Sequence, residues 1–200
     1  TQTMGDTYRL LGELLSLPEA AETLASYCDR IYAMAVELME KVGENRVTAL
    51  YLTGTEGLNV IARGSYHSEV IDLMTENLAV VDSPSSKGTG NETDMEQLLL
   101  WNPEVILFSP DSVYETAGSD ALWLELDAIA SGRYYLVPFG PYNWLGFPPS
   151  VQRYLGILWL GDLLYPEYTD YDLYESVHEY YELFYRCDLT REQFDALVGR

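Results

Sequence analysis

The sequence is short of positive charge. Among its 200 residues, Lys and Arg number 11 while Asp and Glu number 32, so the formal net charge at pH 7 is −21. A surface this acidic repels the phosphate backbone of nucleic acids and the anionic headgroups of lipids. The composition therefore argues against nucleic acid as a partner.

Cysteine is scarce as well. The chain has only Cys28 and Cys187, which do not make a disulfide framework. No CxxC motif or Cys/His cluster indicates zinc, so no metal site is predicted. We expect two buried thiols. A single bridge between them in an oxidising compartment stays open.

Long apolar runs and catalytic motifs are also missing. No stretch has the length of a membrane-spanning helix, and the opening residues 1–4 do not read as a signal peptide. The abrupt opening leads us to expect a fragment of a longer gene product. There is no GxGxxG, no GxxxxGK[ST] and no GxSxG motif, and neither His67 nor His178 has an HExxH context. We predict no catalytic residue, no cofactor and no enzyme activity.

What is present at the start of the chain is helical periodicity. Residues 4–15 form a short amphipathic pattern, and from residue 18 to 42 apolar residues recur at steps of three and four. Pro18 suits a first helical turn and Gly43 suits a helix end. The pattern predicts one long helix of about 36 Å at roughly 1.5 Å per residue.

After residue 43, short apolar runs alternate with helical patterns. Buried strands are predicted at 47–52, 78–81, 105–108 and 134–137, with a small strand at 59–62. Helices are predicted at 68–77, 94–101, 122–130, 150–164, 171–186 and 190–198. This alternation is typical of an α/β fold with a mainly parallel sheet flanked by helices. We predict a helical segment over residues 1–43 and an α/β lobe over residues 44–200.

Three loops close to the predicted strands are candidates for a ligand site. In open α/β sheets, ligands bind outside the carboxyl ends of the strands, and free N–H groups at a helix start suit anionic ligand edges. The loops are residues 63–68, residues 83–88 and the Gly/Pro-braced aromatic loop 139–149, whose central residues are expected at its tip. The candidate ligand-binding residues are Arg63, Ser65, Tyr66, His67, Ser85, Lys87, Tyr142, Asn143 and Trp144.

Two segments resemble one known family. Residues 94–106, DMEQLLLWNPEVI, look like the EQLL-x-W-(N/D)-P-(D/E)-V-I segment of periplasmic substrate-binding proteins. The subgroup is that of ABC importers for iron siderophores, haem and cobalamin. Asn143-Trp144, Pro148-Pro149 and residues 153–160 are similar to the segment that closes the second lobe of those proteins. The resemblance extends over roughly residues 18–198.

The resemblance implies a two-lobed protein whose lobes are joined by one long helix, with the ligand in the cleft between them. This chain would supply that linker helix and the C-terminal lobe, without the N-terminal lobe. It implies a monomer, periplasmic or on the extracellular face of the cytoplasmic membrane, with or without a lipid anchor. Such a protein captures an iron complex or cobalamin-like chelate and delivers it to an ABC permease. By the motif, Glu96 would be the docking residue for the permease.

Three alternatives stay open. The ligand of the same fold could be an oxyanion such as molybdate or tungstate. The chain could be the lobe of an enzyme that handles metals or tetrapyrroles, in which His67 is the well-placed titratable group. It could also be a fragment with a structural interaction role. The positions of residues 65–68 and 139–149 separate these alternatives. If both segments lie at one open edge, ligand binding is favoured, and if they are scattered, it is not.

Overall fold

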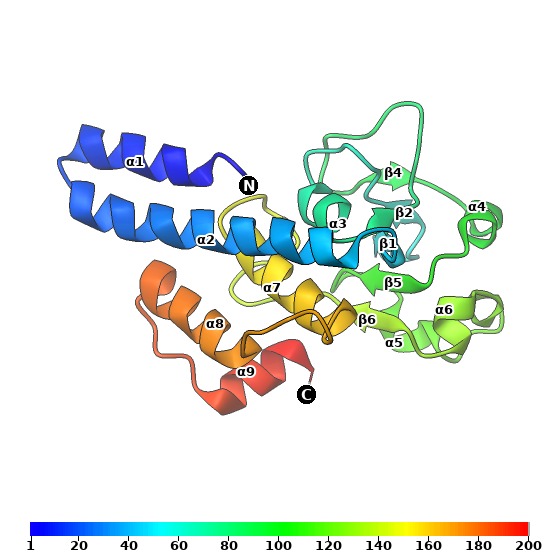
Figure 1. Cartoon of the computed structure of the whole chain (residues 1–200). Coiled ribbons are helices and arrows are strands. Elements are labelled where there is room, and N and C mark those ends of the chain that lie inside the picture. Colours follow the sequence, from blue (N-terminus) through cyan, green and yellow to red (C-terminus); the bar gives the residue numbers. More distant parts are fainter. Residues whose placement is uncertain (200) are drawn as a thin grey trace. The chain divides into compact units, whose positions relative to one another are not determined.

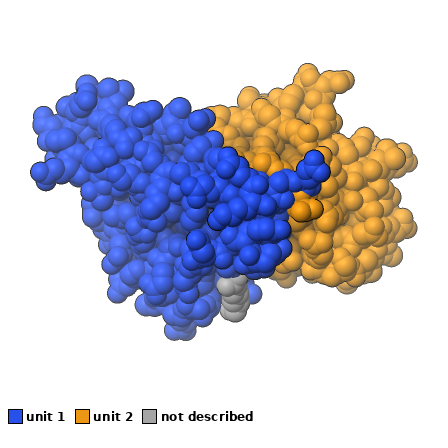
Figure 2. Space-filling model, in the orientation of Figure 1, with its two compact units in different colours: residues 1–44, 150–200 blue, residues 45–149 orange. Residues whose placement is uncertain are grey.

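The computed structural model describes residues 1–199, which form two compact units (Figure 2). One unit joins residues 1–44 with residues 150–200, and the other is residues 45–149. The compact units thus differ from the expected division at residue 43, because helices after residue 150 pack with those at the start of the chain. A ligand-binding lobe over residues 44–200 stays a prediction.

The helical unit begins with a hairpin of α1 (Met4–Leu15) and α2 (Pro18–Val42), visible in Figure 1. The two helices approach closely because Gly12 has no side chain, and a Cβ there would lie 2.3 Å from the Cβ of Ala21. Arg9 bridges the hairpin by donating to Glu22 and pairing with Asp29 at 2.8 Å. The prediction of one unbroken helix from residue 18 to 42 is confirmed.

The same unit is completed by α7 (Arg153–Leu164), α8 (Leu173–Tyr180), a π-helical turn (Tyr181–Tyr185) and α9 (Arg191–Val198). Tyr27 of α2 contacts the rings of Tyr154 and Tyr180 edge-on, so aromatic packing joins α2 to α7 and α8. Both cysteines are free thiols: Cys28 is buried as expected, whereas Cys187 is exposed.

The second unit is built on a sheet around β1 (Thr48–Thr53), in the order β4-β2-β1-β5-β6. β5 (Val105–Phe108) runs parallel to β1, and β6 (Tyr134–Leu136) runs parallel to β5. β3 (Glu76–Asn77) also pairs with β1 in parallel. β2 (Asn59–Val60) and β4 (Asn91–Glu92) form the antiparallel edge. The predicted mainly parallel α/β fold is confirmed.

Short helices complete the second unit: α3 (Glu69–Met74), α4 (Met95–Trp101), α5 (Tyr114–Ala117), a 3₁₀ turn (Trp123–Glu125) and α6 (Asp127–Ala130). β1 is buried from Ala49 onward and β5 along its whole length, as in strands that are covered on both sides. Leu50, Leu52, Ile106 and Phe108 are at the centre of the core. None of the described helices is long and apolar enough to cross a membrane.

Three predicted elements differ from the structure. The helix expected at 68–77 ends at Met74, and Glu76–Asn77 form β3. The strand expected at residues 78–81 is displaced to Glu76–Asn77, because the Asn77 amide is held by Asp72 and by the carbonyl of Ile61. Beyond it Val80 is 63% exposed. The helix expected at 122–130 is interrupted at Leu126, whose extended backbone separates the 3₁₀ turn from α6.

Candidate functional site

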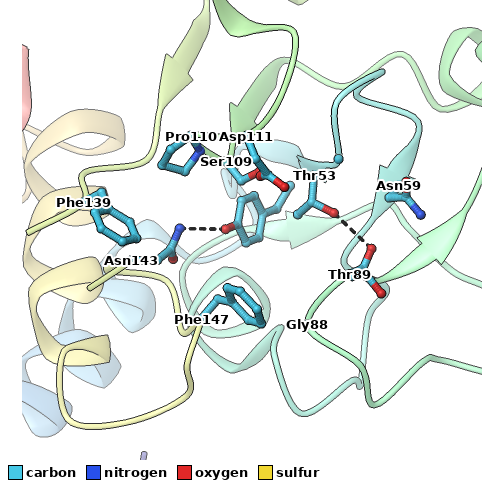
Figure 3. Close-up of a pocket in the computed structure, with 12 residues that line it drawn as sticks. Thr53, Asn59, Gly88, Thr89, Ser109, Pro110, Asp111, Phe139, Asn143 and Phe147 are labelled. Atoms are coloured by element: carbon cyan, nitrogen blue, oxygen red, sulfur yellow. Dashed lines mark hydrogen bonds between the residues drawn. The ribbon is translucent and has the colours of Figure 1, made fainter. Parts of the chain in front are cut away.

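A pocket of about 310 Å³ lies at the carboxyl edge of the parallel strands (Figure 3). β1 ends there in Thr53, β5 is followed by Ser109, and the chain after β6 supplies Phe139. Carboxyl ends of parallel strands meet at one edge, which is where open α/β sheets bind ligands. The pocket is lined by Tyr51, Thr53, Gly54, Asn59, Gly88, Thr89, Ser109, Pro110, Asp111, Phe139, Asn143 and Phe147.

Loop 83–90 reaches the pocket through one hydrogen bond to the end of β1. The Thr53 hydroxyl donates to the carbonyl oxygen of Thr89 at 3.0 Å (Figure 3). Farther back in the loop, the Asn91 side chain accepts from the Ser85 N–H and donates to the Ser83 carbonyl. These bonds set the loop beside the strand end, so that Gly88 and Thr89 become part of the wall.

The aromatic loop 139–149 folds against β1 through Asn143. The Asn143 Nδ2 donates to the hydroxyl of Tyr51 at 2.9 Å (Figure 3). Its Oδ1 accepts from the Leu145 N–H at 2.9 Å. Backbone bridges also pair Asn143 with Phe139 and with Phe147. Asn143 is 2% exposed, so a buried amide holds this loop in place.

The prediction that Asn143 and Trp144 are presented at the tip of this loop is wrong, whereas Tyr142 is half exposed. Trp144 is fully buried, and its indole N–H donates to the carbonyl oxygen of Gly140 at 3.1 Å. Because that bond satisfies the one polar group of the indole, the whole ring can be withdrawn from water. The exposed aromatic side chains are instead its neighbours Phe139, Tyr142 and Phe147, at 56%, 49% and 54% exposure.

Phe147 packs against defined neighbours although about half of its surface is exposed. Gly88 gives it room, since a Cβ at Gly88 would lie 2.0 Å from Cε2 of Phe147. The ring of His67 contacts it with centroids 6.0 Å apart. Nδ1 of His67 donates to the carbonyl oxygen of Gly146 at 2.9 Å, because a carbonyl can only accept. All three predicted loops therefore meet around Phe147.

Of the nine predicted ligand-binding residues, Asn143 alone is among those that line the pocket. Lys87 adjoins the lining residue Gly88 and is exposed, and none of the described carboxylates forms an ion pair with it. Ser85 lies deeper in that loop, and its hydroxyl accepts from the Lys87 N–H at 3.2 Å. Tyr142 is half exposed beside the pocket-lining loop residues.

The first predicted loop, residues 63–68, lies next to the pocket-lining residue Phe147. His67 contacts Phe147, whereas Tyr66 is 58% exposed. The Ser65 hydroxyl is buried and has no hydrogen-bond partner among the described residues. The Arg63 guanidinium lies 4.0 Å from the Glu76 carboxylate, outside the pocket lining. This loop therefore contacts the lining residue Phe147 through His67, but none of its own residues lines the pocket.

Most of the residues that line the pocket were not predicted from the sequence. Gly54, Ser109, Pro110 and Asp111 directly follow the two strongest strand patterns, so their position after a buried parallel strand was the available signal. The direction of Tyr51 toward the pocket carried no such signal, because residues 49–52 are a continuous apolar run without alternation. Gly88 lies inside the second candidate loop and Thr89 one residue beyond it, and neither was among the predicted ligand-binding residues.

The electrostatics of the lining are negative. Asp111 carries a carboxylate, and no Lys, Arg or His is among the lining residues. Burial raises the pKa of the Tyr51 phenol well above its ordinary value, and the nearby Asp111 charge adds to this rise. The phenol therefore stays protonated at neutral pH. Among residues 1–199, no group of three or more His, Cys, Asp and Glu side chains could hold a metal ion.

Comparison with known proteins agrees with this geometry. A sequence model of the periplasmic binding protein family matches residues 2–140. The chain belongs to the periplasmic binding protein family. Similar proteins are solute-binding proteins and not enzymes.

Solved structures of solute-binding proteins match over the whole length of the chain. An ABC transporter solute-binding protein from Sulfurospirillum deleyianum is 29% identical with a TM-score of 0.91. A periplasmic solute-binding protein from Veillonella parvula is 28% identical with a TM-score of 0.82. The chain spans 62% and 61% of these two proteins, so each relative has a substantial part without a counterpart here.

The molybdate-binding protein MolA of Haemophilus influenzae is a third relative. It is 33% identical over 129 residues, which cover 62% of this chain and 36% of MolA. The structure of MolA bound to molybdate has a TM-score of 0.72 at 22% identity, a likeness that concerns the fold alone.

Replacing Asn143 by Ala tests the anchor of the aromatic loop. The variant loses the bonds to Tyr51 and to the Leu145 N–H, and it leaves buried groups unsatisfied. We expect the free energy of unfolding to fall by about 1–3 kcal/mol in urea titrations. The control Tyr51→Phe removes only one of the two bonds and should cost less. A loss for Asn143→Ala no greater than that for Tyr51→Phe would contradict the anchoring role.

Proposed function

We propose that this chain is the linker helix and C-terminal lobe of the substrate-binding protein of an ABC importer. Its ligand is a metal chelate, either an iron complex such as a siderophore or haem, or a cobalamin-like complex. The protein captures it outside the cytoplasmic membrane and delivers it to the permease. The observation that carries this proposal is a pocket at the carboxyl edge of the sheet with two half-exposed phenylalanines in its wall.

The aromatic wall favours a ligand that has apolar or flat faces. Phe139 and Phe147 each leave more than half of their surface open to solvent beside the pocket. Exposed rings of this size are stabilised when an apolar ligand covers them. Small-molecule sites are concave, mostly apolar and carry a few oriented polar groups, which describes this pocket.

The volume of the pocket also favours a metal chelate over a bare oxyanion. About 310 Å³ is room for roughly ten water molecules at ~30 Å³ each, and it lies at the lower end of small-molecule pockets. A tetrahedral oxyanion alone would leave much of this space to water. A chelate with an organic frame fills it and contacts the phenylalanine rings.

A second candidate ligand is an oxyanion of the molybdate or tungstate type. The observation in its favour is the 33% identity to the molybdate-binding protein MolA. Neutral hydroxyl and amide groups such as those of Tyr51 and Asn59 suit oxyanion oxygens. The two candidates differ in size and charge, so a binding experiment separates them.

We test the ligand class on the protein purified from its source. Native mass spectrometry should show an excess mass that carries iron or cobalt, and calorimetry should show binding of a ferric trishydroxamate, haemin or cyanocobalamin. Phe147→Ala should weaken that binding about tenfold by removing an apolar contact. Leu122→Ala, which removes a half-exposed apolar side chain that does not line the pocket, is the matched control. Binding of molybdate alone would favour the second candidate.

We also propose that Glu96 docks against the permease. It lies in the first turn of α4, is exposed, and has no ion-pair partner among the described residues. A docking carboxylate needs that availability, since an internal partner would compete with a cation on another protein. Contacts of this kind govern encounter and orientation more than affinity.

Glu96→Arg is therefore expected to lower transport about tenfold in uptake assays while ligand affinity stays within about twofold. The effect should shrink at high salt, because the Debye length is about 8 Å at physiological ionic strength. Glu125→Arg, the same charge reversal at another exposed position, is the control. Loss of ligand binding in Glu96→Arg would assign Glu96 to the ligand site instead.

A further inference from the structure

Two of the hydroxyl groups that line the pocket donate their protons within the protein. Thr53 donates to the carbonyl oxygen of Thr89, and Ser109 donates to Oδ1 of the Asp111 carboxylate. What these two hydroxyls still offer to a ligand is oxygen lone pairs. The Asn143 amide is committed in part, because Nδ2 donates one of its two hydrogens to Tyr51 and Oδ1 accepts from Leu145.

The one formal charge in the lining is the carboxylate of Asp111. It lies beside Ser109 in the segment after β5 (Figure 3). No cation in the lining offsets it. Lys87 adjoins Gly88 along the chain but does not line the pocket. The surroundings add no compensation, because residues 45–149 contain 4 Lys and Arg against 14 Asp and Glu.

We propose that Asp111 sets the charge of the ligand: the pocket takes a metal complex of zero or positive net charge and turns away a bare oxyanion. This inference rests on the proposed function and adds to it the net charge of the ligand. An oxyanion in this space would face the Asp111 carboxylate and the lone pairs of Ser109 and Thr53 with no lining cation to balance it. A neutral complex meets no such repulsion, and a coordinated water or an ammonium group on it can donate to the carboxylate.

The structure also explains why the negative charge can be held there at little cost. Asp111 is exposed to solvent, so the carboxylate remains hydrated until a ligand covers it. Ser109 supplies a hydrogen bond that orients one oxygen, and the other oxygen is available to the pocket. A ligand that removes water from Asp111 must replace that hydration, which a donor group does and an anion does not.

The test measures three ligands by calorimetry on the protein purified from its source: a neutral ferric trishydroxamate, a trianionic ferric triscatecholate and molybdate. The wild type should bind the neutral complex at least about tenfold more tightly than either anion. Asp111→Asn keeps the size of the side chain and an acceptor for Ser109, and it should tighten molybdate binding about tenfold. Binding of the neutral complex should change by less than about threefold.

Two further variants sharpen the result. Glu115→Gln removes the same charge from an exposed helix position that does not line the pocket, and it should leave all three affinities unchanged. Asp111→Ala should reproduce the gain for molybdate, which separates the effect of charge from any misplacement of the Asn amide. Unfolding midpoints of all variants are compared with that of the wild type.

The outcomes distinguish the inference from the function on which it rests. If the wild type binds the neutral chelate and Asp111→Asn changes nothing, or Glu115→Gln gives the same gain, the charge-setting role of Asp111 is overturned alone. If the wild type prefers molybdate, the role is overturned and the oxyanion candidate is favoured. If no variant binds any of the three ligands, haemin or cyanocobalamin, the proposed function fails together with the inference.

Discussion

The hydrogen bond between Asn143 and Tyr51 is the interaction on which the site depends. It ties a loop of Gly, Pro and aromatic residues to the central strand of the sheet, and both partners are buried. Because Asn143 also pairs with the backbone on both sides, Phe139 and Phe147 are held at fixed places in the pocket wall. The loop is therefore a fixed part of the pocket wall although several of its side chains face water.

This anchoring explains how one small unit can present an apolar surface to solvent and keep its fold. Trp144 is buried with its N–H satisfied by Gly140, so the largest ring of the loop stabilises the unit. The Phe147 ring packs against the ring of His67 and directly against the backbone of Gly88, where any side chain would clash with it. The unit separates rings that contribute to folding from rings that are available to a ligand, within a stretch of nine residues from Phe139 to Phe147.

The sequence predicted the fold better than the site, for physical reasons. Periodicity along residues 18–42 and the apolar runs of β1 and β5 reflect burial, which the pattern of side chains records directly. The same logic placed the three loops near one another. It failed for Trp144, because whether a loop aromatic turns inward depends on a carbonyl partner, Gly140, that no local pattern reveals. It also missed Asp111, whose importance comes from the pocket that other segments build around it.

The central proposal is that the pocket at the carboxyl edge of β1 and β5 is where this member of the periplasmic binding protein family holds an iron or cobalt chelate. Anomalous X-ray diffraction from crystals of the protein purified from its source, collected at the absorption edges of iron, cobalt and molybdenum, tests it most directly. The account predicts an iron or cobalt peak in the pocket between Phe139 and Phe147. Ligand density bound away from these residues, or a molybdenum peak against Asp111, would contradict it.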